Sequence, residues 1–398
     1  MSGIQELANM PTLSTPKERI ASVDKIGREI ARKFADEVDS ESRFPIEAAN
    51  ALREIGAFAW PIPVEYGGLG IEPLEIAKQC AALAQHCAST AAAFAMHHTQ
   101  ILSVVHHSKN NPALQDYMRR VAKENRIIAS VTSEVGPGGN MRTSQCAVEM
   151  TGNRYSLNKK STTLSYGKYA DDLMITARKD ASAASGDQVL VIAEGGQFTL
   201  SDEGSWNTLG MRGTCSPPFT VDAQGEAWQV MDVPFADIAT QTMVPTSHIF
   251  WAASWYGVAA DAVSKARELL RLKAKATPGT IPLGATRVVD LDAALQTMEF
   301  EVFGMAREYT EALQEPDRHS LSSLSFAKRI NALKLTCSKS AIAIVTESLA
   351  SCGIQAYKNG GPFSLGRHLR DVHSSVHQVH NDRLQQTNAS ILTIHKGA

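Results

Sequence analysis

Residues 44–70 read FPIEAANALREIGAFAWPIPVEYGGLG, and this stretch sets the organisation of the first part of the chain. Apolar residues recur at helical spacing until the PIPVEYGGLG segment, where proline and glycine interrupt the helix. The next stretch, 74–107, is long, alanine-rich and apolar on most sides, as expected of a helix buried among other helices. We therefore predict an N-terminal helical domain over residues 16–126.

The character of the sequence changes twice more along the chain. Between 127 and 245, short β-branched or alternating runs such as DLMITARK and QVLVIAE are separated by turn residues, which predicts a β-sandwich or barrel domain. From 246 to 398, four long amphipathic stretches with short links predict a C-terminal four-helix bundle. The predicted fold class is α+β, in the order helices, strands, helices.

Composition narrows the class of protein. The chain has 398 residues, with 20% charged and 43% apolar residues, as expected of a globular protein with more than one core. A net charge of −2 without a basic block gives no support to nucleic-acid binding. No signal-like segment and no apolar run of about 18 residues is present, so we expect a cytoplasmic protein without a membrane span. The six cysteines form no C-x-x-C pair, which predicts reduced thiols and no metal site.

Four motifs in this order resemble those of the acyl-CoA dehydrogenase superfamily of flavoproteins. Residues 44–70 resemble the N-terminal signature of that family, with its Pro-x-x-Tyr-Gly-Gly-x-Gly turn. ASVTSEVGPGGN (129–140) resembles its flavin-contacting loop, and WNTLGMRGTCS (206–216) resembles its Trp-x-x-Leu-Gly-Met-Arg-Gly-Thr hairpin. RHLRD (367–371) resembles its Arg-Asp element near the C-terminus. The resemblance covers nearly the whole chain and implies the acyl-CoA dehydrogenase fold.

The same resemblance implies a flavin cofactor, either FAD or FMN. The loop at 131–140 has no bulky side chain near its glycines, so its backbone can approach a ring or a phosphate closely. In the segment NKKSTTLSYGKYA (158–170), hydroxyl residues stand where the family has an aromatic residue and a threonine near flavin N5. The cofactor-binding residues implied are Val131, Thr132, Ser133, Gly138, Gly139, Asn140, Thr163, Ser165 and Arg271.

The chain lacks the catalytic glutamate of the family. In most relatives this residue follows the Arg-Asp element by about eight positions, which here is Val379. In a minority it lies on the first bundle helix, near Ser247 in this chain. No glutamate occurs after Glu347, and the nearest acid to Val379 is Asp382.

In these departures the chain resembles one branch of the superfamily, the flavin-dependent monooxygenases of the dibenzothiophene monooxygenase and 4-hydroxyphenylacetate hydroxylase type. Those enzymes take reduced flavin from a reductase and use O2, and histidine and hydroxyl side chains serve their sites. His373, His377 and His380 would share one face of a final helix, although such a face is often solvated. The implied catalytic residues are His97, His98, Ser165, His373 and His377, and the substrate-pocket residues are Phe94, Arg212, Trp251 and Trp255.

Two other functions stay open at this stage. The first is an acyl-CoA dehydrogenase that desaturates an acyl thioester with another base, such as Asp382 or a histidine. The second is a non-catalytic flavin-binding protein. In every case we expect a small-molecule ligand, and the family resemblance implies a homotetramer.

Overall fold

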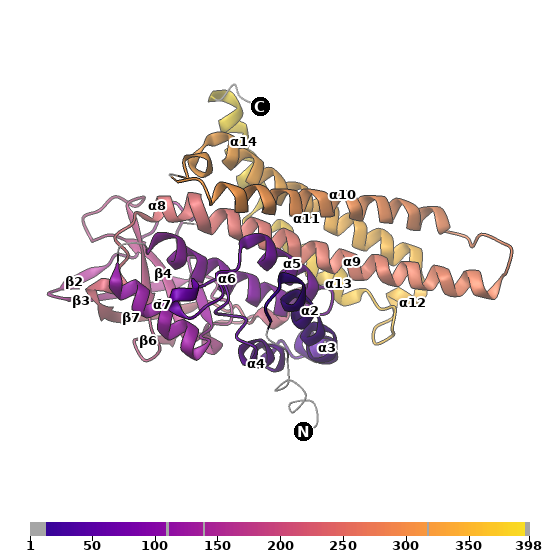
Figure 1. Cartoon of the computed structure of the whole chain (residues 1–398), viewed down its shortest axis with the longest axis horizontal. Helices are drawn as coiled ribbons and strands as arrows, with labels where there is room; N and C mark the ends of the chain where they lie inside the picture. The colour runs from indigo at the N-terminus through magenta and orange to yellow at the C-terminus, as the bar shows by residue number, and fades with distance from the viewer. Residues whose placement is uncertain (1–12, 109–110, 138–139, 317, 395–398) are drawn as a thin grey trace.

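The computed structural model describes residues 13–108, 111–137, 140–316 and 318–394. Figure 1 shows the N-terminal helices and the strands gathered on one side of a long helix, α9. The hairpin of α9 and α10 extends beyond this body. The predicted order of helices, strands and helices is confirmed.

The N-terminal part is helical, as predicted. Thr15 caps the first helix with a capping box, and Asn111 caps the last one ahead of Pro112. Between them, α6 is buried along nearly its whole length because its alanine-rich surface is apolar on most sides. The helices are α2 (Pro16–Ile26), a π-helix (Gly27–Ala31), α3 (Arg32–Ser40), α4 (Ile46–Glu54), α5 (Pro73–Ala84), α6 (Ala88–His107) and α7 (Pro112–Glu124).

Two separate sheets form the middle part. In the first, β1 pairs with β4 in parallel and β4 pairs with β5 antiparallel. The second sheet is antiparallel in the order β2-β3-β7-β6, and it alternates between buried and exposed residues. The strands are β1 (Ile128–Val131), β2 (Glu149–Thr151), β3 (Arg154–Ser161), β4 (Asp172–Arg178), β5 (Gln188–Ala193), β6 (Phe198–Ser201) and β7 (Phe219–Glu226).

The first sheet is the middle layer of this part of the molecule. β4 and β5 are buried on both faces, which explains why their sequences read as continuous apolar runs. One face packs with residues of α6 and α7, and Tyr155 from the second sheet donates a hydrogen bond to the Ile192 carbonyl (2.8 Å). The sandwich alternative of the prediction is therefore correct and the barrel alternative is wrong, since the two sheets do not join.

The C-terminal part contains three long helices that pack side by side. The first of them, α9, also packs closely against α5 of the N-terminal part, since a Cβ added at Gly257 would lie 2.2 Å from the Ala81 carbonyl oxygen. The first helical run begins at Phe235, about ten residues before the predicted boundary at 246. The helices are α8 (Phe235–Ile238), a π-helix (Ala239–Met243), α9 (Val244–Ala276), α10 (Ala285–Ala312), α11 (Leu324–Cys352), α12 (Ile354–Tyr357), α13 (Gly366–Val372) and α14 (Asn381–Ile394).

The predicted fourth bundle helix is broken, which corrects the sequence analysis. α13 ends at Val372, a 3₁₀ turn covers His373–Val376, and α14 starts only at Asn381. Val379 has a φ of 54°, in the left-handed region that interrupts a right-handed helix. His373, His377 and His380 therefore do not share one helical face.

Two further observations concern the described residues only. None of their helices has both the length and the apolarity to cross a membrane. All six cysteines are free thiols, and five of them are buried.

Candidate functional site

A cavity of about 370 Å³, here called the outer cavity, lies between the middle part and the bundle. It is lined by the loop at 140–142, by α8 and the π-helix after it, and by the first turns of α9. The start of α11 and residues 379–387 complete its wall. This volume falls in the range of small-molecule sites, and most of the wall is apolar.

The charged groups of the outer cavity are cationic. Arg142 and Arg383 line it, and its described wall contains no aspartate or glutamate. His248 also lines it, and burial lowers the pKa of this ring to about 3, with Lys334 nearby adding to the effect. His248 was not among the predicted site residues. It directly follows Ser247, the position at which a minority of the family has its catalytic glutamate.

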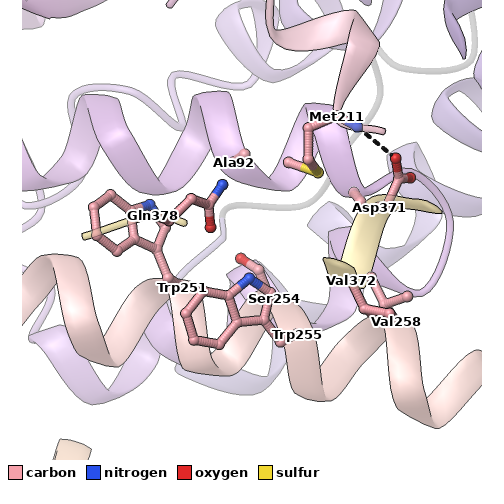
Figure 2. Close-up of a pocket in the computed structure, with 10 residues that line it drawn as sticks. Ala92, Met211, Trp251, Ser254, Trp255, Val258, Asp371, Val372 and Gln378 are labelled. Atoms are coloured by element: carbon pink, nitrogen blue, oxygen red, sulfur yellow. Dashed lines mark hydrogen bonds between the residues drawn. The ribbon is translucent and has the colours of Figure 1, made fainter. Parts of the chain in front are cut away.

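A second, inner pocket of only about 10 Å³ lies behind Trp251, which lines both spaces (Figure 2). Ala92 of α6, Trp255 of α9, Met211 of the hairpin and Gln378 of the turn before α14 surround it. It holds no more than one water-sized group. Trp251 and Trp255, which were predicted as substrate-pocket residues, thus line these spaces.

Asp371 is the one carboxylate among the described residues that line either space. Its Oδ1 accepts a hydrogen bond from the Met211 backbone N–H (2.7 Å, Figure 2). Burial raises the pKa of Asp371 to about 6, although Arg367 and the hydrogen bond act in the opposite direction. Asp382, the acid considered from sequence, has a side chain that is 84% exposed and lines neither space.

A row of hydroxyl groups lies on the β-sheet side, as expected of the proposed flavin segment. Ser133 Oγ contacts Ser161 Oγ (2.8 Å) and accepts a hydrogen bond from Thr163 N (3.0 Å). Ser216 donates to Ser165 Oγ (2.8 Å), so the Ser165 hydroxyl hydrogen is left to donate elsewhere. The side chain of Thr163 is exposed, while Ser133 and Ser165 are partly buried.

His97 and His98 do not face the pockets, contrary to the prediction. His97 Nε2 contacts the Phe58 carbonyl (2.7 Å), and His97 Nδ1 accepts from the Ile128 N–H (3.0 Å), which is the pattern of a neutral ring. His98 contacts the carbonyls of Phe94 and Ala57, and complete burial lowers its pKa to about 4. These rings pack with Phe94, so that residue is also part of the core.

His373 and His377 are exposed and line neither space, which corrects their placement across a pocket from His97. The rings of His377 and His380 lie 5.7 Å apart. These three side chains therefore face solvent, because the turn that breaks the helix directs them outward.

The remaining predicted residues have other surroundings. Arg212 Nε donates to the Asp39 carbonyl (2.7 Å), so it fastens the hairpin to α3 and does not line a pocket. Arg271 is exposed near the far end of α9, about 35 Å along the helix from His248. Val131 is buried in β1, Thr132 is partly buried, and Asn140 lines the outer cavity. The predicted residues Gly138 and Gly139 lie outside the described residues.

Within the part of the chain that the structure describes, no three histidine, cysteine, aspartate or glutamate side chains gather as metal ligands would.

Comparison with known proteins agrees with this fold. Residues 17–125 match the acyl-CoA dehydrogenase N-terminal domain. A cyclohex-1-ene-1-carbonyl-CoA dehydrogenase of Syntrophus aciditrophicus is 28% identical over 47% of this chain and 45% of its own length, so that match spans about half of each protein. The enzyme of the same name from Geobacter metallireducens is 24% identical over 89% of this chain and 93% of that protein.

Solved structures with two different activities share the fold. The FMN-bound dibenzothiophene monooxygenase TdsC from Paenibacillus sp. A11-2 has a TM-score of 0.83 at 16% identity, over 95% of this chain and 98% of that chain. Butyryl-CoA dehydrogenase from Megasphaera elsdenii has a TM-score of 0.79 at 18% identity, with the same coverage of both chains. The architecture is the acyl-CoA dehydrogenase fold. Within this fold, residues 17–125 match the acyl-CoA dehydrogenase N-terminal domain, and the chain is similar in sequence to an acyl-CoA dehydrogenase over most of its length.

Proposed function

We propose that this protein is a flavin-dependent monooxygenase that receives reduced flavin from a separate reductase and uses O2 on a small organic substrate. The observation that carries the proposal is the absence of a free carboxylate among the described residues of both spaces. Desaturation of an acyl thioester needs a base at the substrate, and Val379 occupies the position of the family glutamate. Asp371, the one carboxylate among the described residues that line these spaces, accepts a hydrogen bond from the Met211 backbone N–H of the hairpin.

The chain has suitable groups for holding a flavin. Ser165 offers a hydroxyl that can donate at the polar edge of a ring, while Ser133 donates to the Thr163 carbonyl (2.7 Å) and so holds the neighbouring segment in place. Asn140 and Arg142 offer an amide and a cation to a phosphate at the outer cavity. A bound reduced flavin supplies the electrons for the reaction with O2. The apolar wall of the outer cavity excludes bulk water from that reaction.

The proposed assembly is a homotetramer. The outward face of the α9–α10 hairpin exposes apolar side chains, including Leu283, Val289 and Phe300, which supports burial against further copies of the chain. Arg271 is too far from the outer cavity of its own chain, and in such an assembly it would serve the phosphate of a neighbouring copy.

A second candidate is the desaturation of an acyl thioester, and two observations favour it. The cationic wall formed by Arg142 and Arg383 suits an anionic ligand such as a CoA phosphate. In addition, a pKa of about 6 for Asp371 is suitable for a general base.

A stopped-flow experiment separates the two functions. The protein is loaded with reduced FMN or FAD and mixed with oxygenated buffer. A transient near-ultraviolet band before oxidised flavin returns is the result expected for a monooxygenase. If no band forms, and if acyl-CoA bleaches the oxidised flavin without air in the wild type but not in Asp371→Asn, the second candidate replaces the first.

A further inference from the structure

The inner pocket presents one hydrogen-bonding atom without a partner. Gln378 Oε1 is buried and accepts no hydrogen bond from the described residues. Figure 2 shows this amide beside Trp251, directed toward the space between Ala92 and Ser254. Two other polar groups of the pocket are engaged, since Ser254 Oγ donates to the Phe250 carbonyl (2.8 Å) and Asp371 accepts from Met211. A buried acceptor of this kind favours a ligand that donates a hydrogen bond.

The turn that carries Gln378 is fixed from behind by a buried lysine. Lys334 of α11 has no exposed surface, and its Nζ donates to the Val379 carbonyl and to Asn381 Oδ1, at 2.6 Å in both cases. Asn381 in turn donates to Ser338 Oγ (3.1 Å). Val379, whose carbonyl accepts from Lys334, has the left-handed φ that a β-branched residue adopts only when its surroundings impose it.

Burial of the Lys334 ammonium group costs a large free energy for a purely structural contact. Among the described residues, no carboxylate forms an ion pair with it, and both of its oxygen partners are neutral. Its Nζ lies 5.8 Å from the ring centroid of Trp255, which lines the inner pocket. The lysine therefore connects the turn at 377–381 to the wall of the inner pocket, in addition to closing the turn.

We propose that the inner pocket is a subsite for a hydroxyl or N–H group of the substrate, that Gln378 accepts its hydrogen bond, and that Lys334 is the positioning residue for Gln378. The small volume restricts the subsite to a water-sized group, while the rest of the substrate occupies the outer cavity, with which the inner pocket shares Trp251. This assignment describes the substrate of the proposed monooxygenase and so rests on the proposed function. The binding it predicts needs neither flavin reduction nor O2.

The test uses a matched pair of probes, 4-ethylphenol and 1-ethyl-4-fluorobenzene. The first has a hydroxyl group where the second has a fluorine atom of similar size. Calorimetric titration of the full chain measures the dissociation constant of each. We expect the phenol to bind about tenfold more tightly, because the fluoro compound leaves Gln378 Oε1 without a donor. Gln378→Leu should abolish this preference. Equal binding of both probes, or binding of neither, would overturn the proposal.

Lys334→Met tests the positioning role, with Lys339→Met on the exposed face of the same helix as the control. We expect Lys334→Met to reduce the preference for phenol at least threefold and to speed amide hydrogen exchange at 377–381 at least tenfold. Exchange elsewhere in α11 should stay as in the control. A variant that keeps both the preference and slow exchange would remove Lys334 from the proposal. Because flavin and O2 are absent from these measurements, their result is independent of the stopped-flow outcome.

Discussion

At the residue scale, burial decided what each histidine can do. His97 and His98 are completely buried, and their ring nitrogens contact backbone groups of neighbouring segments. His373 and His377 are exposed. A histidine in a sequence is equally compatible with a catalytic site, a core hydrogen bond and a solvated turn, and only its neighbours distinguish these cases. For Ser165 the resemblance predicted a hydroxyl beside the flavin, and the structure adds that Ser216 donates a hydrogen bond to it.

Ser165→Ala should weaken flavin binding about fivefold. The substitution removes the hydroxyl that Ser216 orients, at a cost of about 1 kcal/mol for one neutral hydrogen bond. Fluorescence titration with FMN and with FAD measures the dissociation constants. Ser201→Ala, an exposed serine of β6, is the control. Wild-type affinity in Ser165→Ala would separate this residue from the cofactor site.

At the element scale, the approach of the hairpin to the Arg-Asp segment organises the inner pocket. Gly210 lies against the backbone, so that an added Cβ would lie 2.2 Å from the Arg370 carbonyl oxygen and 2.7 Å from Asp371 N. The next residue, Met211, donates to Asp371, so this contact holds two pocket-lining residues together. Glycine is required here by close packing, since its φ is not in the left-handed region.

Gly210→Ala should destabilise the protein by about 2–4 kcal/mol, because backbone atoms cannot move aside as a flexible side chain can. Thermal unfolding measures this as a lower Tm. Gly304→Ala is the matched control: this glycine lies within α10 with nothing within 4 Å of an added Cβ, so alanine should be neutral or slightly stabilising. Equal Tm values for the two variants would contradict the close-packing argument.

At the scale of the whole molecule, buried ionisable groups link stability to pH. Burial lowers the pKa of His248 to about 3 and that of His97 well below its usual value. These rings stay neutral in the folded state but take up protons in the unfolded chain, so their contribution is present above about pH 6.5 and is lost as pH falls. Burial raises the pKa of Asp172 and Asp371 to about 6. Below that pH these carboxyls take up protons in the folded state before they do so in the unfolded chain, which is a smaller and stabilising effect as the pH falls.

The protein should therefore lose about 5 kcal/mol of stability between pH 7 and pH 5. The completely buried histidines, which are His97, His98, His248 and His368, each contribute a loss of about 2 kcal/mol at pH 5, and the two aspartates each offset about 1 kcal/mol of it. Denaturant unfolding at both pH values measures the change. His248→Gln should reduce the pH dependence, while His377→Ala, at an exposed position, should leave it unchanged. Higher stability at pH 5 would refute this assignment.

The sequence by itself determined the order of helices, strands and helices, and its motifs indicated the acyl-CoA dehydrogenase fold. Helical and alternating periodicities depend on which residues are apolar, and they are local. The spacing from the Arg-Asp element also predicts that Val379 stands where the family has a glutamate. Tertiary structure alone decided which side chains meet at the pockets. The break before α14 depends on Lys334, which is 45 residues from Val379 in the chain. Gln378 and His248 reach the pocket walls through contacts between distant segments, and no local pattern encodes such contacts.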